Sequence, residues 1–287
     1  MVIECRVAES NGVPGCPCRI CLPDDRSEWD ELDFDNAETI AKHGRVVLAV
    51  DGEPGPGWSY TIGLTDTVGT PELIIFGLSS TTRHFIFNGI GEALRDGQLA
   101  RSEGLVPPGV GSENLPFELK ALSKEWGWDF GRVACWLNRN RESAFWQVVW
   151  TDREACFPWN RDLDDEFTDA QPSGWLPPPT PAESQWGRAY VATIWPTTGP
   201  ANNLVFVSSS VQEGREPIRL VMHFEDGDLS FLDGIGPYDS DSMALLHLEH
   251  VLERDPIVVD LIDLPGGFEA YREAVNQRWE RQQTIDS

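Results

Sequence analysis

A dense run of prolines near the middle of the chain constrains the fold more than any other feature of the sequence. Residues 171–182 contain Pro172, Pro177, Pro178, Pro179 and Pro181. Proline fixes φ and lacks a backbone N–H, so this run is incompatible with a regular helix or a central strand. We predict an extended, semi-rigid spacer here. The acidic stretch Asp162–Asp169 precedes it, and together the two segments indicate a domain boundary.

The length of 287 residues supports two hydrophobic cores, because domains commonly contain about 100–150 residues. We predict an N-terminal domain over residues 1–165, an acidic and proline-rich linker over residues 166–185, and a C-terminal domain over residues 186–287. The expected fold class is α+β, with two α+β domains joined by the linker.

Local patterns predict the elements of the N-terminal domain. A helix is expected from an N-cap at Asn36 to a C-cap at Gly44, and another from Ser79 to about Arg95 with Phe85, Ile86, Ile90 and Leu94 on one face. Strands are expected at Arg45–Val50, Trp58–Leu64, Leu73–Phe76, Val133–Leu137 and Phe145–Trp150.

In the C-terminal domain, apolar runs predict strands at Leu204–Ser208, Pro217–Phe224 and Leu229–Leu232. An Asp-Gly pair joins the last two and favours a tight hairpin turn. Helical spacing predicts helices at Ser242–Leu252 and from Phe268 to about Gln282.

The charge balance excludes some partners. The chain has 47 acidic and 22 basic residues, a net charge of −25, and no two Lys or Arg are adjacent. Nucleic-acid binding draws its affinity from cations that neutralise phosphates, so no nucleic-acid partner is expected. A basic protein is the partner that this charge favours. Solubility alone is the alternative explanation.

No apolar run approaches the roughly 20 residues of a membrane span, and Met1–Ser10 has no signal-peptide core. We therefore predict a cytoplasmic protein without membrane contact. In a reducing compartment the six cysteines are expected to be thiols or metal ligands. Cys16, Cys18 and Cys21 have the spacing of a zinc site, with Cys5 or a histidine as the fourth ligand. The alternative is reduced thiols in an N-terminal arm.

Polar residues at strand ends suggest a ligand pocket in the N-terminal domain, because glycines at Gly57 and Gly63 flank one strand and permit close approach of a ligand. The candidate ligand-binding residues are Tyr60, Thr61, Thr65, Glu72, Asp152 and Trp159. Tight turns and core packing explain the same residues without a ligand.

The sequence contains no set of residues typical of catalysis. Ser-His-Asp, Cys-His and HExxH patterns and phosphate-binding glycine loops are absent, and His43 and His84 are interpreted as structural. In the C-terminal domain, the acidic turn of Glu225, Asp226 and Asp228, with Trp186 and Trp195 as exposed aromatic residues, is the candidate surface for a basic partner. A solvated hairpin tip is the alternative explanation of this turn.

Six segments of the first half of the chain carry a family resemblance: Cys18–Cys21, Lys42–Gly44, Trp58–Thr65, Pro71–Leu78, Trp150–Asp152 and Phe157–Trp159. On these segments, residues from about 16 to 160 resemble the bacterial family of domains of unknown function numbered 4262. This resemblance implies a compact α+β domain and no assigned chemistry.

Four segments of the second half carry another resemblance: Val205–Ser208, Asp226–Asp233, His250–Asp255 and Leu264–Arg272. On these segments, residues from about 203 to 279 resemble family 33 of the immunity proteins found in bacterial polymorphic toxin systems. Leu229, Phe268 and Tyr271 stand at positions where tryptophan is common in that family. The resemblance implies binding of a toxin rather than catalysis. The leading hypothesis is therefore a non-catalytic, immunity- or defence-related protein whose acidic C-terminal domain binds a basic partner such as a toxin. The alternative is a small-ligand or cofactor protein, or an enzyme, with its pocket in the N-terminal domain.

Overall fold

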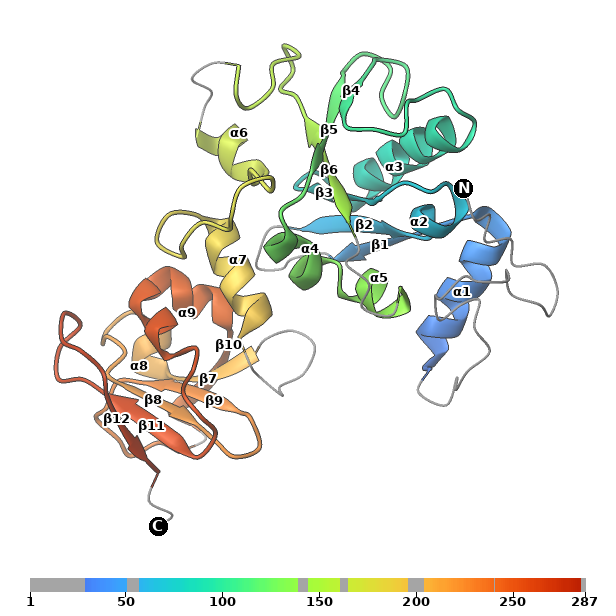
Figure 1. Cartoon of the computed structure of the whole chain (residues 1–287). Helices are drawn as coiled ribbons and strands as arrows, with labels where there is room; N and C mark the ends of the chain where they lie inside the picture. The colour runs from blue at the N-terminus through green and yellow to red at the C-terminus, as the bar shows by residue number, and fades with distance from the viewer. Residues whose placement is uncertain are drawn as a thin grey trace. The chain divides into compact units, whose positions relative to one another are not determined.

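Two compact units make up the computed structural model of the chain, Met1–Pro178 and Pro179–Ser287 (Figure 1). The structure describes residues 29–50, 57–138, 144–160, 165–195, 204–239 and 241–284. Each unit contains a six-stranded mixed sheet with helices, which confirms the α+β class. The division between the units falls inside the predicted linker region of residues 166–185.

The first described helix, α1 (Glu31–His43), is fixed by its two caps. Asp30 accepts a hydrogen bond from the Asp33 N–H, and the Asp33 side chain accepts one from the Asp30 N–H, which forms a capping box. Gly44 ends the helix at φ 79°, as predicted. The predicted start was wrong, because Asn36 is buried within the helix and the cap lies at Asp30.

The sheet of the first unit has the order β1-β2-β3-β6-β5-β4. Its strands are β1 (Val46–Val50), β2 (Trp58–Ile62), β3 (Glu72–Phe76), β4 (Gly104–Val106), β5 (Phe117–Ala121) and β6 (Phe145–Trp150). Only β3 and β6 pair in parallel; the other neighbours are antiparallel. The three strands predicted at Arg45–Val50, Trp58–Leu64 and Leu73–Phe76 are confirmed within a few residues.

Both faces of this sheet carry helices (Figure 1). Besides α1, the described helices of the unit are α2 (Leu64–Thr67), α3 (Ser80–Arg95), α4 (Lys124–Phe130), α5 (Arg132–Leu137) and α6 (Asp165–Ala170). One core joins β3 to α3 through Leu73, Ile75, Phe87 and Ile90. An aromatic cluster packs α4 against the sheet, with the Phe76 ring 5.6 Å from both Trp126 and Phe130.

The strand predicted at Val133–Leu137 was wrong, since these residues lie in α5. Cys135 and Leu137 are buried while Val133 and Trp136 are only partly so. Val133–Leu137 is a continuous run of five apolar residues. Such a short run fits a helix as well as a strand, and periodicity cannot separate the two.

The proline-rich segment does not run as a free spacer over its first half. Gln147 binds it on two sides, since its Nε2 donates to the Pro172 carbonyl at 2.8 Å and its Oε1 accepts from the Gly174 N–H at 2.9 Å. The Trp126 indole donates to the Leu176 carbonyl at 2.8 Å. These bonds hold residues 172–176 on the first unit, so the prediction of a spacer over the whole of residues 171–182 needs this correction.

The sheet of the second unit has the order β10-β7-β9-β8-β11-β12, in which only β7 and β9 are parallel. Its strands are β7 (Leu204–Ser208), β8 (Leu220–His223), β9 (Leu229–Leu232), β10 (Met243–His247), β11 (Phe268–Tyr271) and β12 (Glu280–Gln283). The helices are α7 (Gln185–Ile194), α8 (Ser209–Gln212), α9 (Leu248–Arg254) and the 3₁₀ helix η2 (Pro256–Leu261).

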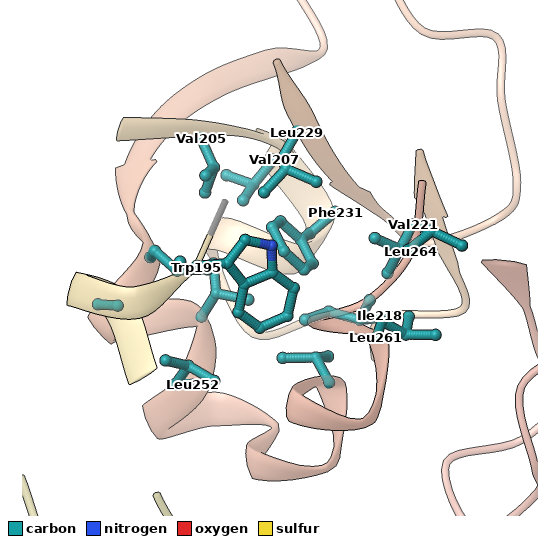
Figure 2. Packing of buried hydrophobic residues seen from close by; sticks show 14 of the residues in the cluster. Trp195, Val205, Val207, Ile218, Val221, Leu229, Phe231, Leu252, Leu261 and Leu264 are labelled. Atoms are coloured by element: carbon teal, nitrogen blue, oxygen red, sulfur yellow. The ribbon is translucent and has the colours of Figure 1, made fainter. Parts of the chain in front are cut away.

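Trp195 stands in the core of this second unit, with its ring 6.3 Å from Phe231 (Figure 2). Val205, Val207 and Leu252 pack in the same cluster. The helices and the inward side chains of the sheet thus share one apolar core.

Of two helices predicted for the second unit, one was wrong and the other was right only for residues 248–252. Ser242–Leu252 contains β10 before α9 begins at Leu248, and the helix predicted from Phe268 to Gln282 is the antiparallel pair β11 and β12. In both segments pairing with a distant strand overrides the helical spacing of apolar residues, because β10 pairs with β7 and β11 pairs with β8.

Candidate functional site

The predicted ligand residue Glu72 has a structural role. Its buried carboxylate accepts hydrogen bonds from the Thr61 hydroxyl at 2.8 Å and from the backbone N–H groups of Gly63, Leu64 and Thr65 at 2.9, 3.2 and 3.0 Å. The three N–H groups belong to the start of α2, where helix N–H groups lack partners within the helix. Glu72 therefore caps α2.

Burial raises the pKa of Glu72 to about 6, while the hydrogen bonds from Thr65, Thr61 and Gly63 oppose that shift. The carboxylate is enclosed by the protein's own donors, and Thr61 is also fully buried. Within the part of the chain that the structure describes, neither Glu72 nor Thr61 has exposed surface that an external ligand could contact.

The other predicted ligand residues are dispersed. Tyr60 is buried with its ring 6.4 Å from Phe145, and burial raises its pKa to about 12. Tyr60 and Thr61 are consecutive in β2, so their side chains point to opposite faces of the sheet. Trp159 stacks on Phe157 at 5.0 Å in a separate aromatic group. The six residues do not form one pocket, and this prediction was wrong.

A cavity that the sequence did not reveal lies elsewhere in the first unit. It has a volume of about 530 Å³ and is mainly apolar, and we call it the apolar cavity. Its wall comes from α3, the end of β6, α6 and the segments between them, and consists of Leu78, Thr82, Phe85, Ile86, Gly111, Ser112, Glu113, Leu115, Phe117, Trp150, Thr151, Asp152, Arg153 and Phe167. Of the predicted ligand residues, Asp152 alone belongs to it.

Trp150 is held in the wall of the apolar cavity by several contacts. Its indole donates to the Phe76 carbonyl at 3.0 Å, and its backbone exchanges two hydrogen bonds with the Gln171 side chain at 3.2 and 2.8 Å. The Phe167 ring lies edge-on to it at 5.0 Å. The start of the proline-rich segment thus positions one aromatic wall of the cavity.

Phe85 is the residue whose role sequence reasoning misjudged. It was expected on the core face of the helix with Ile86, Ile90 and Leu94. Those three are buried, but Phe85 is 64% exposed and lies at the cavity. Ile86, Ile90 and Leu94 follow one another at a spacing of four residues and therefore lie on one stripe of the helix. Phe85 is rotated from Ile86 by about 100° around the helix axis, and that offset was the signal available in the sequence.

The predicted metal ligands Cys16, Cys18 and Cys21 lie outside the described residues, so the zinc prediction remains open. Of the described cysteines, Cys135 is buried and Cys156 is half-buried. No group of metal-binding side chains occurs in the described ranges. In the same ranges, no helix has the length and apolar character that crossing a membrane requires.

The predicted acidic turn in the second unit forms as a β8–β9 hairpin. Glu225 and Asp226 are exposed, Asp228 is half-buried, and the Asp226 carboxylate accepts a hydrogen bond from the Asp228 N–H at 3.1 Å. The expectation of exposed aromatic residues beside it was wrong, because Trp186 and Trp195 are both buried in the core.

Comparison with known proteins supports the first of the two family resemblances. Residues 39–164 match the model of a family described as a domain of unknown function, DUF4262. That range includes every residue of the apolar cavity except Phe167. No curated protein and no solved structure matches the chain. The resemblance of the C-terminal half to immunity-protein family 33 gains no such support and stays a prediction.

Proposed function

We propose that the first unit binds one small, mainly apolar molecule in the apolar cavity. The observation that carries this proposal is the exposure of two large apolar side chains on the cavity wall, Phe85 at 64% and Leu78 at 36%. Covering such side chains is favourable by about 25 cal/mol per Å² of apolar surface. A volume of about 530 Å³ suits a small organic ligand.

The backbone at Leu78 supports the same proposal. Leu78 has φ 58°, a left-handed conformation that is costly for a residue with a branched side chain. The buried Arg83 side chain donates to the carbonyls of Gly77 and Leu78, each at 3.3 Å. The structure therefore maintains an unfavourable backbone conformation that places Leu78 at the cavity.

Polar groups give the cavity a means of orienting its ligand. Thr151 is 3% exposed, and its hydroxyl has no hydrogen-bond partner among the described residues. Ser112, Glu113 and Arg153 also contribute to the wall. A ligand with an apolar body and one polar group matches this distribution, because a few placed polar groups fix orientation in an otherwise apolar pocket.

Binding of the uncharged fluorescent probe phenylnaphthylamine to the full chain tests the proposal. We expect saturable binding with one probe per chain. The change Phe85→Ser removes the exposed ring and is expected to weaken binding about fivefold to tenfold. Leu105→Ser is the matched control, since Leu105 is 61% exposed but is not part of the cavity wall. An equal effect of both changes, or no saturable binding, would contradict the proposal.

A second candidate function is binding of a basic partner such as a toxin by the second unit. Residues 179–287 contain 18 acidic and 7 basic residues, and none of the basic residues is lysine. The exposed side chains of Glu225 and Asp226 at the hairpin lie within this acidic unit. Complementary charge accelerates association with a basic protein and loses effect as salt screens it.

This second proposal requires a partner captured by the full chain from the producing cell and then purified. Its association rate is expected to fall with added salt and with the double change Glu225→Gln/Asp226→Asn. The control Asp260→Asn/Glu273→Gln removes the same charge from exposed positions away from the hairpin. Equal rates for the two double variants would exclude specific recognition at the turn.

A further inference from the structure

A second cavity in the first unit has a larger polar share in its wall than the apolar cavity and shares no residue with it. It has a volume of about 680 Å³ and lies among α1, β1 and α3. We call it the polar cavity. Its wall consists of Thr39, Lys42, His43, Gly44, Arg45, Val46, Val47, His84, Asn88, Glu92 and Arg95.

The charge of the polar cavity is opposite to that of the chain. Its wall carries Lys42, Arg45 and Arg95 against one acidic residue, Glu92, in a protein whose net charge is −25. Arg95 also forms an exposed ion pair with Asp96, outside the wall, at 3.1 Å, so the cations still exceed the carboxylates. His43 and His84 belong to the same wall. Long-range repulsion disfavours anions over most of this protein, so a local concentration of cations in a cavity is unexpected unless it has a partner.

Helix electrostatics explain only part of this concentration. Lys42 and His43 lie in the last turn of α1, where cations compensate the negative end of the helix dipole. Arg45 comes from the segment that enters β1, and His84 and Arg95 come from α3. Arg95 lies in the last turn of α3 and compensates the dipole of that helix in the same way. Arg45 and His84 have no such relation to a helix end, and they reach the same cavity from different elements.

Arg45 is the buried member of the set and is 8% exposed. Its Nη2 donates to the backbone carbonyl and to the side-chain Oδ1 of Asn88, at 3.2 and 3.1 Å. The Glu92 carboxylate lies 3.9 Å from Nη2, too far for a hydrogen bond, and is itself 59% exposed. Both firm partners of Arg45 are therefore neutral oxygens.

The hydrogen-bonding capacity of the Arg45 guanidinium is not fully used. Its Nε is buried and has no partner among the described residues. A side chain at Gly91 would come within 2.8 Å of that Nε, so glycine is required there for the close approach. Burial lowers the pKa of Arg45, against the opposing effect of Glu92. A buried cation paired mainly with neutral groups is costly, and a bound anion would offset that cost.

We propose that the polar cavity binds the phosphate group of a small phosphorylated molecule, with Arg45 as the fixed contact and Lys42, Arg95 and His84 around it. The number of cations favours a doubly charged anion over a monocarboxylate, and arginine together with lysine suits phosphate oxygens. The volume of about 680 Å³ exceeds that of the phosphate group alone and leaves room for the molecule that carries it.

Calorimetric titration of the full chain with phenyl phosphate, with inorganic phosphate and with acetate tests this proposal at low ionic strength. Saturable binding of phenyl phosphate at one site per chain is expected, with acetate at least about tenfold weaker because it carries half the charge. Binding of inorganic phosphate alone would contradict the inference that the carrier molecule is also accommodated. Equal affinity for acetate would overturn the assignment to phosphate.

The double change Lys42→Ala/Arg95→Ala alters only exposed side chains, so folding is expected to persist. It should weaken phenyl phosphate binding about fivefold or more. Arg101→Ala/Arg215→Ala removes the same charge at exposed positions outside the cavity and is expected to leave binding within about twofold. Equal weakening by both pairs, or no saturable binding to the unaltered chain, would overturn the proposal.

Discussion

The Thr61 hydroxyl donates a hydrogen bond of 2.8 Å to Oε2 of Glu72 and accepts one of 2.8 Å from the Leu73 N–H. This relationship ties β2 to β3 through side chains at the point where Glu72 also caps α2. Two residues predicted to bind a ligand therefore hold the first unit together.

We expect Glu72→Gln to destabilise the first unit by about 2–4 kcal/mol. Each carboxylate oxygen accepts two hydrogen bonds, and the amide group of glutamine would direct N–H donors at two of those donors. Hydrogen exchange in urea, read at β2 and β3, measures the loss. The exposed Glu38→Gln is the matched control and should change little. Unchanged protection in Glu72→Gln would show that the carboxylate does not act as a cap.

Titration of Glu72 should make the stability of the first unit vary with pH. Glu72 has a pKa raised from 4.5 to about 6 in the folded protein, so the folded state holds its proton more tightly than the unfolded chain. The resulting stabilisation is complete below the unfolded pKa and is lost as pH rises through about 6. Between about pH 5 and pH 7, unfolding free energy of the unaltered chain relative to Glu72→Gln should fall by about 1 kcal/mol. An increase over that range would contradict the sign.

Local sequence patterns predicted the structure correctly where interactions between residues close in sequence determine it. Gly44 terminates α1 because a left-handed residue is needed there, and Gly227 occupies the β8–β9 turn at φ 92°. Errors arose where strand pairing over a long sequence separation prevails. The pairing of β11 with β8 joins Phe268 to His223, and nothing within Phe268–Gln282 itself indicates it.

The candidate sites were harder to predict than the elements, because their residues come from separated segments. Phe85 and Trp150 line one cavity from α3 and β6, while Lys42 and Arg95 line another from α1 and α3. The polar residue at the start of β3, Glu72, was predicted to bind a ligand. In the structure its carboxylate instead accepts hydrogen bonds from the protein itself.

The bonds between Gln147 and the proline-rich segment should control cleavage of that segment. Gln147→Leu removes the bonds to Pro172 and Gly174 and leaves two buried backbone groups without partners, at a cost of about 2–4 kcal/mol. Limited proteolysis should then cut residues 171–176 faster than in the unaltered chain, whose first cuts should avoid them. The exposed Gln98→Leu is the control. Equal cleavage rates in all three proteins would show that Gln147 does not protect the segment.

The second unit should depend on Arg272. This buried side chain forms an ion pair with Asp255 and donates to the carbonyls of Ile218 and Val275. Arg272→Met leaves the Asp255 charge buried and should cost about 3–5 kcal/mol. Hydrogen exchange at β8 and β11 measures this loss of stability. The exposed Arg278→Met should have little effect, and similar protection in both variants would contradict the structural role of the pair.

Filling the apolar cavity tests the central claim most directly. Leu115 is part of the cavity wall, and Leu115→Trp adds bulk there without introducing charge. Titration with phenylnaphthylamine should show one site in the unaltered chain and at least about tenfold weaker binding in this variant, since the added ring occupies the ligand volume. The control Leu245→Ser alters a 54% exposed leucine of the second unit and should bind as the unaltered chain does. Undiminished binding by Leu115→Trp, or loss of binding in Leu245→Ser, would contradict the assignment of ligand binding to this cavity.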